Sequence, residues 1–176
     1  SHSRFSQAAA TGLTASSSFV QNVDEIAIIG LSGRYPLADN IEEYWRNLKS
    51  GRDCITEIPQ QRWDYQCYFT EDKNEAGKSY SKWGGFIKDV DCFDPLFFQI
   101  SPREAELIDP QERLFLQTAY HAIEDAGYTP TTLDDNKNVG VFVGVMWGHY
   151  QLYGLQSSTQ IPNSPYWSIA NRISYS

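Results

Sequence analysis

The sequence SPREAE at residues 101–106 is followed after two residues by DPQER at residues 109–113, and the two stretches set two helix starts in succession. In the first, the serine can cap a helix and the proline fits the first helical position, where its missing N–H costs nothing. The glutamate at the third position completes a capping box. The aspartate, proline and glutamate of the second stretch repeat this arrangement eight residues later. Helices are therefore predicted to begin near residues 102 and 110.

The second predicted helix continues over residues 114–125 with a small and aromatic face. Four residues recur on one side of it at helical spacing: Phe115, Ala119, Ala122 and Ala126. Gly127 then supplies the left-handed residue that ends the helix. His121 lies on the same helix and is expected to be structural rather than catalytic.

Four acidic residues gather at the two helix starts: Glu104, Glu106, Asp109 and Glu112. Paired carboxylates of this kind could be read as a glycosidase site, but that chemistry needs a defined facing pair. Carboxylates in the first turn of a helix also interact favourably with the helix dipole. The acids are therefore interpreted as capping and dipole partners.

Two short apolar runs predict strands buried on both faces, as in a parallel sheet covered by helices. The first covers residues 26–29 and ends at Gly30. The second covers residues 139–145, with glycines where a backbone or a ligand could approach closely. The Gly-Leu-Ser-Gly exit of the first run lacks a phosphate-loop ending, which disfavours nucleotide binding. The order strand, helix, helix, strand predicts an α/β sandwich.

The other elements are predicted from amphipathic spacing and turn residues. Residues 40–50 predict a helix that packs on the sheet, with Asn40 as its cap and Gly51 as its stop. Residues 52–94 form a long irregular excursion with one hairpin, in which residues 81–87 are the predicted strand. Residues 165–175 predict a short helix.

Composition narrows the classes of partner and compartment. The 176 residues carry a formal charge of −8, with no block of Lys or Arg dense enough to follow a phosphate backbone, which disfavours nucleic acid as a partner. Cys54, Cys67 and Cys92 are widely spaced without a C-x-x-C pair, which disfavours a metal site or a disulfide framework. No apolar run reaches the roughly 18 residues of a membrane span. We expect a soluble, cytoplasmic protein with no membrane contact.

The first residues differ in composition from the rest. Residues 1–22 are rich in Ser, Ala, Thr and Gln and lack the apolar core of a signal peptide. They are interpreted as a linker or a cloning remnant, and the absence of an initiating Met indicates excision from a larger polypeptide. Residues 23–176 are the predicted domain.

Motifs along the whole of that domain occur in an order known from one family. They are DEIAIIG at 24–30, SGRYP at 32–36, RWD at 62–64, WGGFI at 83–87, the block at 93–128, VGVFVG at 139–144 and ANRISY at 170–175. Together they resemble the ketosynthase (β-ketoacyl synthase) domain of modular polyketide synthases. PYWSI at 165–169 and VMWG at 145–148 look more like the trans-acyltransferase type. The resemblance implies an α/β, thiolase-like layered sandwich, of which this chain carries the N-terminal half only.

The resemblance also implies a reaction. A family member accepts an acyl group from an acyl carrier protein onto a cysteine and joins it to a malonyl-type extender by decarboxylative Claisen condensation, assisted by two histidines. The substrates are carried on phosphopantetheine, and no cofactor is bound directly. By the family pattern the cysteine and both histidines lie beyond Ser176. The chain alone is therefore expected to be inactive, with no catalytic residue of its own.

The resemblance places five residues of this chain near functional regions. Met146, Trp147 and Tyr150 are implied to lie near the acyl tunnel or the subunit interface, and Asn171 and Arg172 near the approach to the nucleophile. Other interpretations stay open, since Met146 and Trp147 are also typical of plain core. Arg172 could equally satisfy buried carbonyl groups.

Two functions remain for the chain. In the first it pairs with the remainder of the ketosynthase, supplied as a second chain or fragment, and the complete domain is a homodimer served by a carrier protein. In the second it is a non-catalytic docking or dimerisation module. A sheet without its later strands would expose unpaired edges and an apolar face, so the chain is not expected to be a stable monomer.

Overall fold

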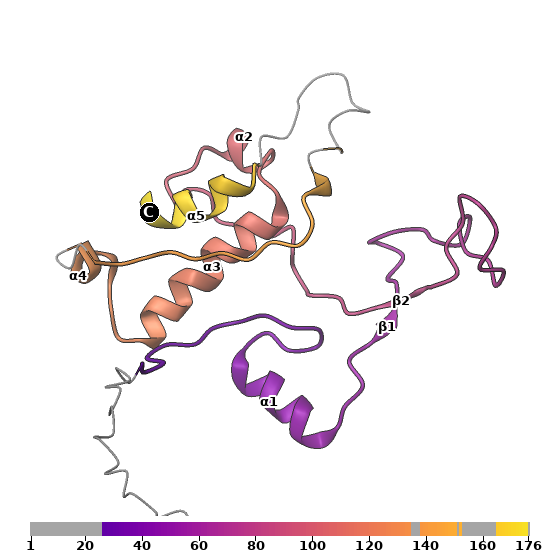
Figure 1. Ribbon diagram of the computed structural model, residues 1–176, viewed down its shortest axis with the longest axis horizontal. Coiled ribbons are helices and arrows are strands. Elements are labelled where there is room, and N and C mark those ends of the chain that lie inside the picture. The colour runs from indigo at the N-terminus through magenta and orange to yellow at the C-terminus, as the bar shows by residue number, and fades with distance from the viewer. Residues whose placement is uncertain (1–25, 135–137, 151, 153–164, 176) are drawn as a thin grey trace, which may run out of the picture.

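The computed structural model describes residues 26–134, 138–150, 152 and 165–175. The predicted linker at residues 1–22 lies outside this range. The elements, in chain order, are α1 (Ile41–Ser50), β1 (Thr56–Glu57), β2 (Trp83–Gly84), α2 (Pro102–Ala105), α3 (Pro110–Asp125), α4 (Pro130–Asp134) and α5 (Tyr166–Tyr175). Helices α2 and α5 lie on one side of α3, and α1 lies on the other side (Figure 1).

The paired helix starts form as predicted. The Ser101 side chain accepts a hydrogen bond from the Glu104 amide at 3.2 Å, at the start of α2. The Asp109 side chain accepts from the Gln111 amide at 2.9 Å, at the start of α3. Each satisfies a backbone N–H that has no partner inside its helix. The left-handed stop at Gly127, with a φ of 79°, is also confirmed.

A small apolar core gathers around the start of α3. It consists of Ile100, Ala105, Ile108 and Leu116, with Phe93, Phe98 and Ile173 packed against it from the outside. These side chains come from α2, α3, α5, the chain before α2 and the connection between α2 and α3, so the core joins the helices on one side of α3. The buried apolar residue of α3 is thus Leu116, one position beyond the predicted face, whose residue Phe115 is only partly buried.

Helix α1 has its predicted ends but not its predicted environment. The Asn40 side chain accepts from the Glu43 amide at 2.9 Å, and Gly51 adopts a left-handed φ of 63°. Tyr44 stacks on Tyr35 with ring centroids 3.9 Å apart. The prediction that this helix packs on a sheet is wrong here, because Trp45 is 57% exposed and no residue of α1 is buried.

The two predicted buried strands are also wrong for this structure. Residues 26–29 and 139–145 have no assigned strand, and Ile26 and Phe142 are each 94% exposed. A strand needs a neighbour to pair its N–H and C=O groups. Within the described residues the named strands are β1 and β2 alone, so neither apolar run has a ladder partner.

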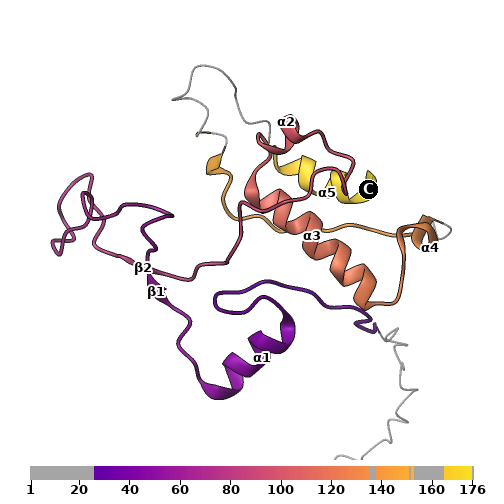
Figure 2. The ribbon, with the colours of Figure 1, turned by 180° about the vertical axis from the view of Figure 1, so that it is seen from behind.

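The long excursion does contain its hairpin, in a shorter form than predicted. β1 pairs antiparallel with β2, with Thr56 opposite Gly84 and Glu57 opposite Trp83. Two residues of the predicted strand 81–87 are thus confirmed. The chain between the two strands projects away from the helices, as the view from behind also shows (Figure 2).

The first apolar run is anchored to the far end of α3. The Leu31 amide donates a hydrogen bond to Asp125 at 2.9 Å. A Cβ atom at Gly30 would overlap the Ala122 carbonyl oxygen and lie 2.8 Å from the Ala126 Cβ. The small face predicted for α3 therefore receives a glycine backbone.

Of the helices in the described part of the chain, none is long and apolar enough to span a bilayer.

Substituting Gly30→Ala is expected to push this run off α3, because the added methyl group meets backbone that cannot move aside. Overpacking of this kind costs about 1–3 kcal/mol. Hydrogen–deuterium exchange at the Leu31 amide measures the effect and should become faster. Gly144→Ala is the control, since a Cβ at Gly144 meets open space. Equal Leu31 exchange in the two variants would contradict the packing described.

Candidate functional site

The α2–α3 junction holds a fully buried carboxylate. The Glu112 side chain, in the first turn of α3, has 0% exposure. The Arg172 Nε of α5 lies 2.7 Å from its Oε1 as an ion pair. The Ser168 hydroxyl, one turn earlier on α5, contacts both carboxylate oxygens, at 2.9 and 3.0 Å. A buried charge is tolerable only when it is paired and hydrogen-bonded, and α5 supplies both requirements.

Arg172 also reaches the second helix of the junction. Its Nη2 donates to Glu104 of α2 at 2.8 Å. One guanidinium group thus links α5 to α2 and α3. The interpretation of Glu104 and Glu112 as capping and dipole partners is therefore incomplete, because both carboxylates bind α5. Arg172 pairs with carboxylate groups in the structure. Buried carbonyl groups were the alternative partners that the sequence had left open.

The segment 146–150 joins the same junction from another direction. The Gln111 Nε2 donates to the Trp147 carbonyl at 2.8 Å, and the Tyr150 hydroxyl donates to the Glu106 carbonyl at 3.3 Å. A Cβ at Gly148 would lie 2.6 Å from the Tyr166 ring, so this segment also approaches the start of α5 closely. The structure therefore brings Trp147 and Tyr150 to the α2–α3 junction that Arg172 also contacts.

The predicted site residues differ in their exposure. Met146 is 80% exposed and Trp147 is 61% exposed, so the interpretation of these two as plain core is wrong for the described chain. Asn171 is exposed on α5, Arg172 is partly buried, and Tyr150 is partly buried. Their roles at an acyl tunnel, an interface or the approach to a nucleophile stay predictions.

Sequence reasoning missed Ser168 and the role of Glu112. A usable signal was present, since Ser168 and Arg172 are four residues apart and lie on one face of a helix. The sequence could not identify Glu112 as the acceptor, because Ser168 and Glu112 are 56 residues apart in the chain.

Among the described residues no group of His, Cys, Asp and Glu has the arrangement of a metal site.

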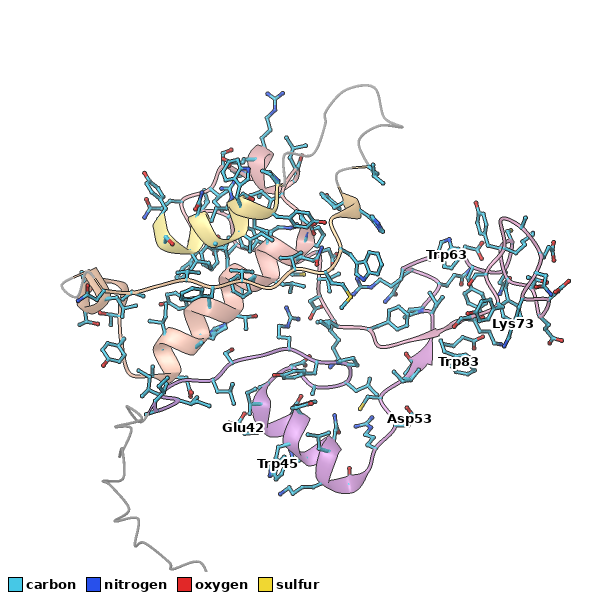
Figure 3. All side chains as sticks on the ribbon, viewed as in Figure 1. Glu42, Trp45, Asp53, Trp63, Lys73 and Trp83 are labelled. Atoms are coloured by element: carbon cyan, nitrogen blue, oxygen red, sulfur yellow. The ribbon has the colours of Figure 1, made fainter. Side chains whose placement is uncertain are left out.

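A second charge cluster ties the hairpin together away from the junction. Lys82 Nζ lies 2.8 Å from Glu57 Oε1, and the Tyr65 hydroxyl donates to the same oxygen. The hydrogen bonds from Lys82 and then Tyr65 hold the pKa of Glu57 below its ordinary value of 4.5. Trp63, Lys73 and Trp83 extend from this region of the molecule, on the side away from α3 and α5 (Figure 3). Glu57 is exposed, Tyr65 and Lys82 are partly buried, and their contacts stay within the hairpin and the chain between its strands.

The solved structures that resemble this chain define its class. A ketosynthase domain of Streptomyces albus, OzmH KS7 of oxazolomycin synthesis, matches with a TM-score of 0.79 and 51% identity, over 84% of this chain and 26% of that one. The module 6 ketosynthase of the bacillaene synthase from Bacillus subtilis matches with a TM-score of 0.69 and 44% identity, over 85% of this chain and 24% of that one. The fold is therefore the N-terminal part of a thiolase-like ketosynthase domain, as predicted.

The family model "Beta-ketoacyl synthase, N-terminal domain" matches residues 23–176, and the chain belongs to this family. Among curated relatives, polyketide synthase PksL of Bacillus subtilis is 59% identical over 88% of this chain, and ThaG of Burkholderia thailandensis is 54% identical over 96%. The chain spans 4% and 3% of the lengths of those two relatives, and about a quarter of the solved ketosynthase chains.

Ser168→Ala is expected to destabilise the domain that contains this chain, because it removes the hydroxyl donor from a buried carboxylate. Leaving such a group less satisfied costs about 1–3 kcal/mol. Chemical denaturation measures the free energy of unfolding. Ser174→Ala, which removes an exposed bond to the Ala170 carbonyl on the same helix, is the matched control. Equal losses in the two variants would argue against the buried contact.

Lys82→Met is expected to raise the pKa of Glu57 toward 4.5, because it removes the largest cause of the lowered value. A carboxyl whose folded pKa is lowered stabilises the hairpin above its unfolded pKa and loses that contribution as the pH falls through the folded value. Carbon-13 NMR titration of the Glu57 carboxyl measures the shift. Lys78→Met is the control, since Lys78 donates to the Cys67 carbonyl. An unchanged Glu57 titration after Lys82→Met would refute the pairing.

Proposed function

We propose that this chain is the N-terminal part of a polyketide synthase ketosynthase of the trans-acyltransferase type, and that the complete domain elongates acyl chains. The proposal is supported chiefly by the TM-score of 0.79 and 51% identity to a ketosynthase domain over 84% of the chain. The curated relatives are polyketide synthases as well. The trans-acyltransferase type is supported by the motifs at residues 145–148 and 165–169.

In the proposed reaction, a cysteine outside this chain attacks the thioester of an acyl group carried on phosphopantetheine, and the carrier thiol leaves. A malonyl-type extender on a carrier protein then loses carbon dioxide. The resulting enolate attacks the acyl–cysteine carbonyl carbon, forms a carbon–carbon bond and releases the cysteine thiolate. Thiolates are good nucleophiles toward thioesters, and backbone N–H groups stabilise the oxyanion.

In that reaction this chain contributes side chains held in fixed positions rather than a reacting group. Met146 and Trp147 present large exposed side chains on a segment that Gln111 and Tyr150 hold at the helix junction. Side chains of this kind suit the wall of an acyl tunnel or a subunit interface, because both uses would cover their apolar surface. Asn171 and Arg172, on α5, are proposed to lie near the approach to the nucleophile.

The proposal includes the partners of the complete domain. The remainder of the ketosynthase, as a second chain or as a continuation of this one, would supply the cysteine and two histidines. An acyl carrier protein would deliver both substrates, and the complete domain would be a homodimer. A cytoplasmic location is supported by three free thiols, at Cys54, Cys67 and Cys92, since disulfides are rare in that compartment.

One observation also supports a second function. The nearly complete exposure of Ile26 and Phe142 gives the chain apolar surface that a partner would cover. A ketosynthase-like docking or dimerisation module without chemistry would use the same surface. The two functions differ in whether a cysteine in the assembled domain becomes acylated.

The test is intact-mass spectrometry of the assembled ketosynthase domain after incubation with an acyl N-acetylcysteamine thioester. We expect a mass increase of one acyl group, located by peptide mapping outside residues 1–176. Decarboxylation of a malonyl carrier protein by the acylated domain should then yield a β-ketoacyl product. An assembled domain that gains no acyl group would favour the docking module, and an acyl group on Cys54, Cys67 or Cys92 would refute the proposed nucleophile.

A further inference from the structure

Helix α5 faces the α2–α3 junction with two parallel rows of side chains. The apolar row consists of Ile169, which is buried, and Ile173, which packs on the core cluster. The polar row consists of Ser168 and Arg172, and both of these side chains contact Glu112. In each row the two residues are four positions apart, so the rows run side by side along the helix.

The two rows differ in how strongly they fix the position of α5. Apolar contact is non-directional, and a helix surface repeats its ridges about every turn, 5.4 Å along the axis. An isoleucine row would therefore also pack after a shift or a rotation. The polar row would not, because any shift separates Glu112 from the charge and the hydroxyl that compensate its burial.

We propose that Glu112 is a positioning residue for acylation of the ketosynthase cysteine: through Arg172 and Ser168 it fixes the translation and rotation of α5. The inference rests on the proposed function, in which α5 lies near the approach to the nucleophilic cysteine. A carboxylate with no exposed surface, an ion-pair distance of 2.7 Å and two hydroxyl contacts define one arrangement of the helix. Glu104 adds a second, exposed anchor for the same guanidinium.

Stability alone gives a weaker explanation of this cluster. Replacing a buried ion pair by apolar residues of similar size is often neutral or stabilising, whereas removing one partner leaves a buried charge and is strongly destabilising. If the ion pair serves to fix the position of α5, replacing it should leave the stability unchanged and lower the reaction rate. A pair kept only for stability should show the two losses together.

The experiment uses the complete ketosynthase domain and the double variant Glu112→Leu with Arg172→Met. The melting temperature, the exchange of α5 amides and the kcat and KM for cysteine acylation by an acyl N-acetylcysteamine thioester are measured. We expect a melting temperature close to that of the unsubstituted domain, faster α5 exchange and at least a tenfold lower kcat. The KM should stay within about twofold, since the other proposed site residues, Met146, Trp147, Tyr150 and Asn171, are unchanged.

Two further variants complete the test. Asp39→Leu with Lys88→Met removes an exposed ion pair of 3.1 Å and is the matched control, expected to leave kcat and α5 exchange unchanged. Glu112→Gln keeps the size of the side chain and removes its charge. It should also speed α5 exchange and lower kcat, so it decides the question if the double variant does not fold.

The proposal is overturned if the double variant, or Glu112→Gln where the double variant does not fold, keeps the α5 exchange of the unsubstituted domain. It is also overturned if the variant acylates at the unsubstituted rate. Failure of the proposed function has a different signature, in which the unsubstituted domain itself gains no acyl group. In that case α5 exchange alone decides whether Glu112 sets the position of the helix.

Discussion

The structure depends on the burial of one carboxylate. Glu112 lies in the first turn of α3 and has no exposed surface, so its charge must be matched inside the protein. Arg172 and Ser168 provide the match from α5, at the far end of the described chain. This need forces a distant segment back onto the start of α3. Glu104 then joins α2 to the same guanidinium.

The apolar contribution to this arrangement is small. Among the described residues only six hydrophobic side chains are buried, and four of them form the cluster beside the polar junction. Large apolar side chains, Ile26, Ile28 and Phe142 among them, stay exposed on the two runs that the sequence predicted as strands. The chain belongs to the β-ketoacyl synthase family and covers about a quarter of each of two solved ketosynthase chains.

Local features of the fold were predictable because their causes lie within a few residues. The caps at Asn40, Ser101 and Asp109 satisfy amides two or three positions away, and Gly51 and Gly127 adopt the left-handed conformation that a helix stop requires. The helix at residues 166–175 and the hairpin strand at 83–84 follow from equally local patterns. The order of motifs also identified the family, which the family model confirms.

By itself, then, the sequence determined the caps of α1, α2 and α3, the family and the kind of chemistry in which the complete domain is proposed to take part, but it did not predict α4. The tertiary structure decided which side chains meet. It paired Ser168 and Arg172 with Glu112, brought Trp147 to Gln111, and left the two apolar runs without strand partners. The physical reason is the distance along the chain over which each interaction acts. Capping and helix periodicity join residues about four positions apart, so the local sequence reveals them. Ion pairs and sheet ladders join residues at any separation, which the local sequence does not reveal.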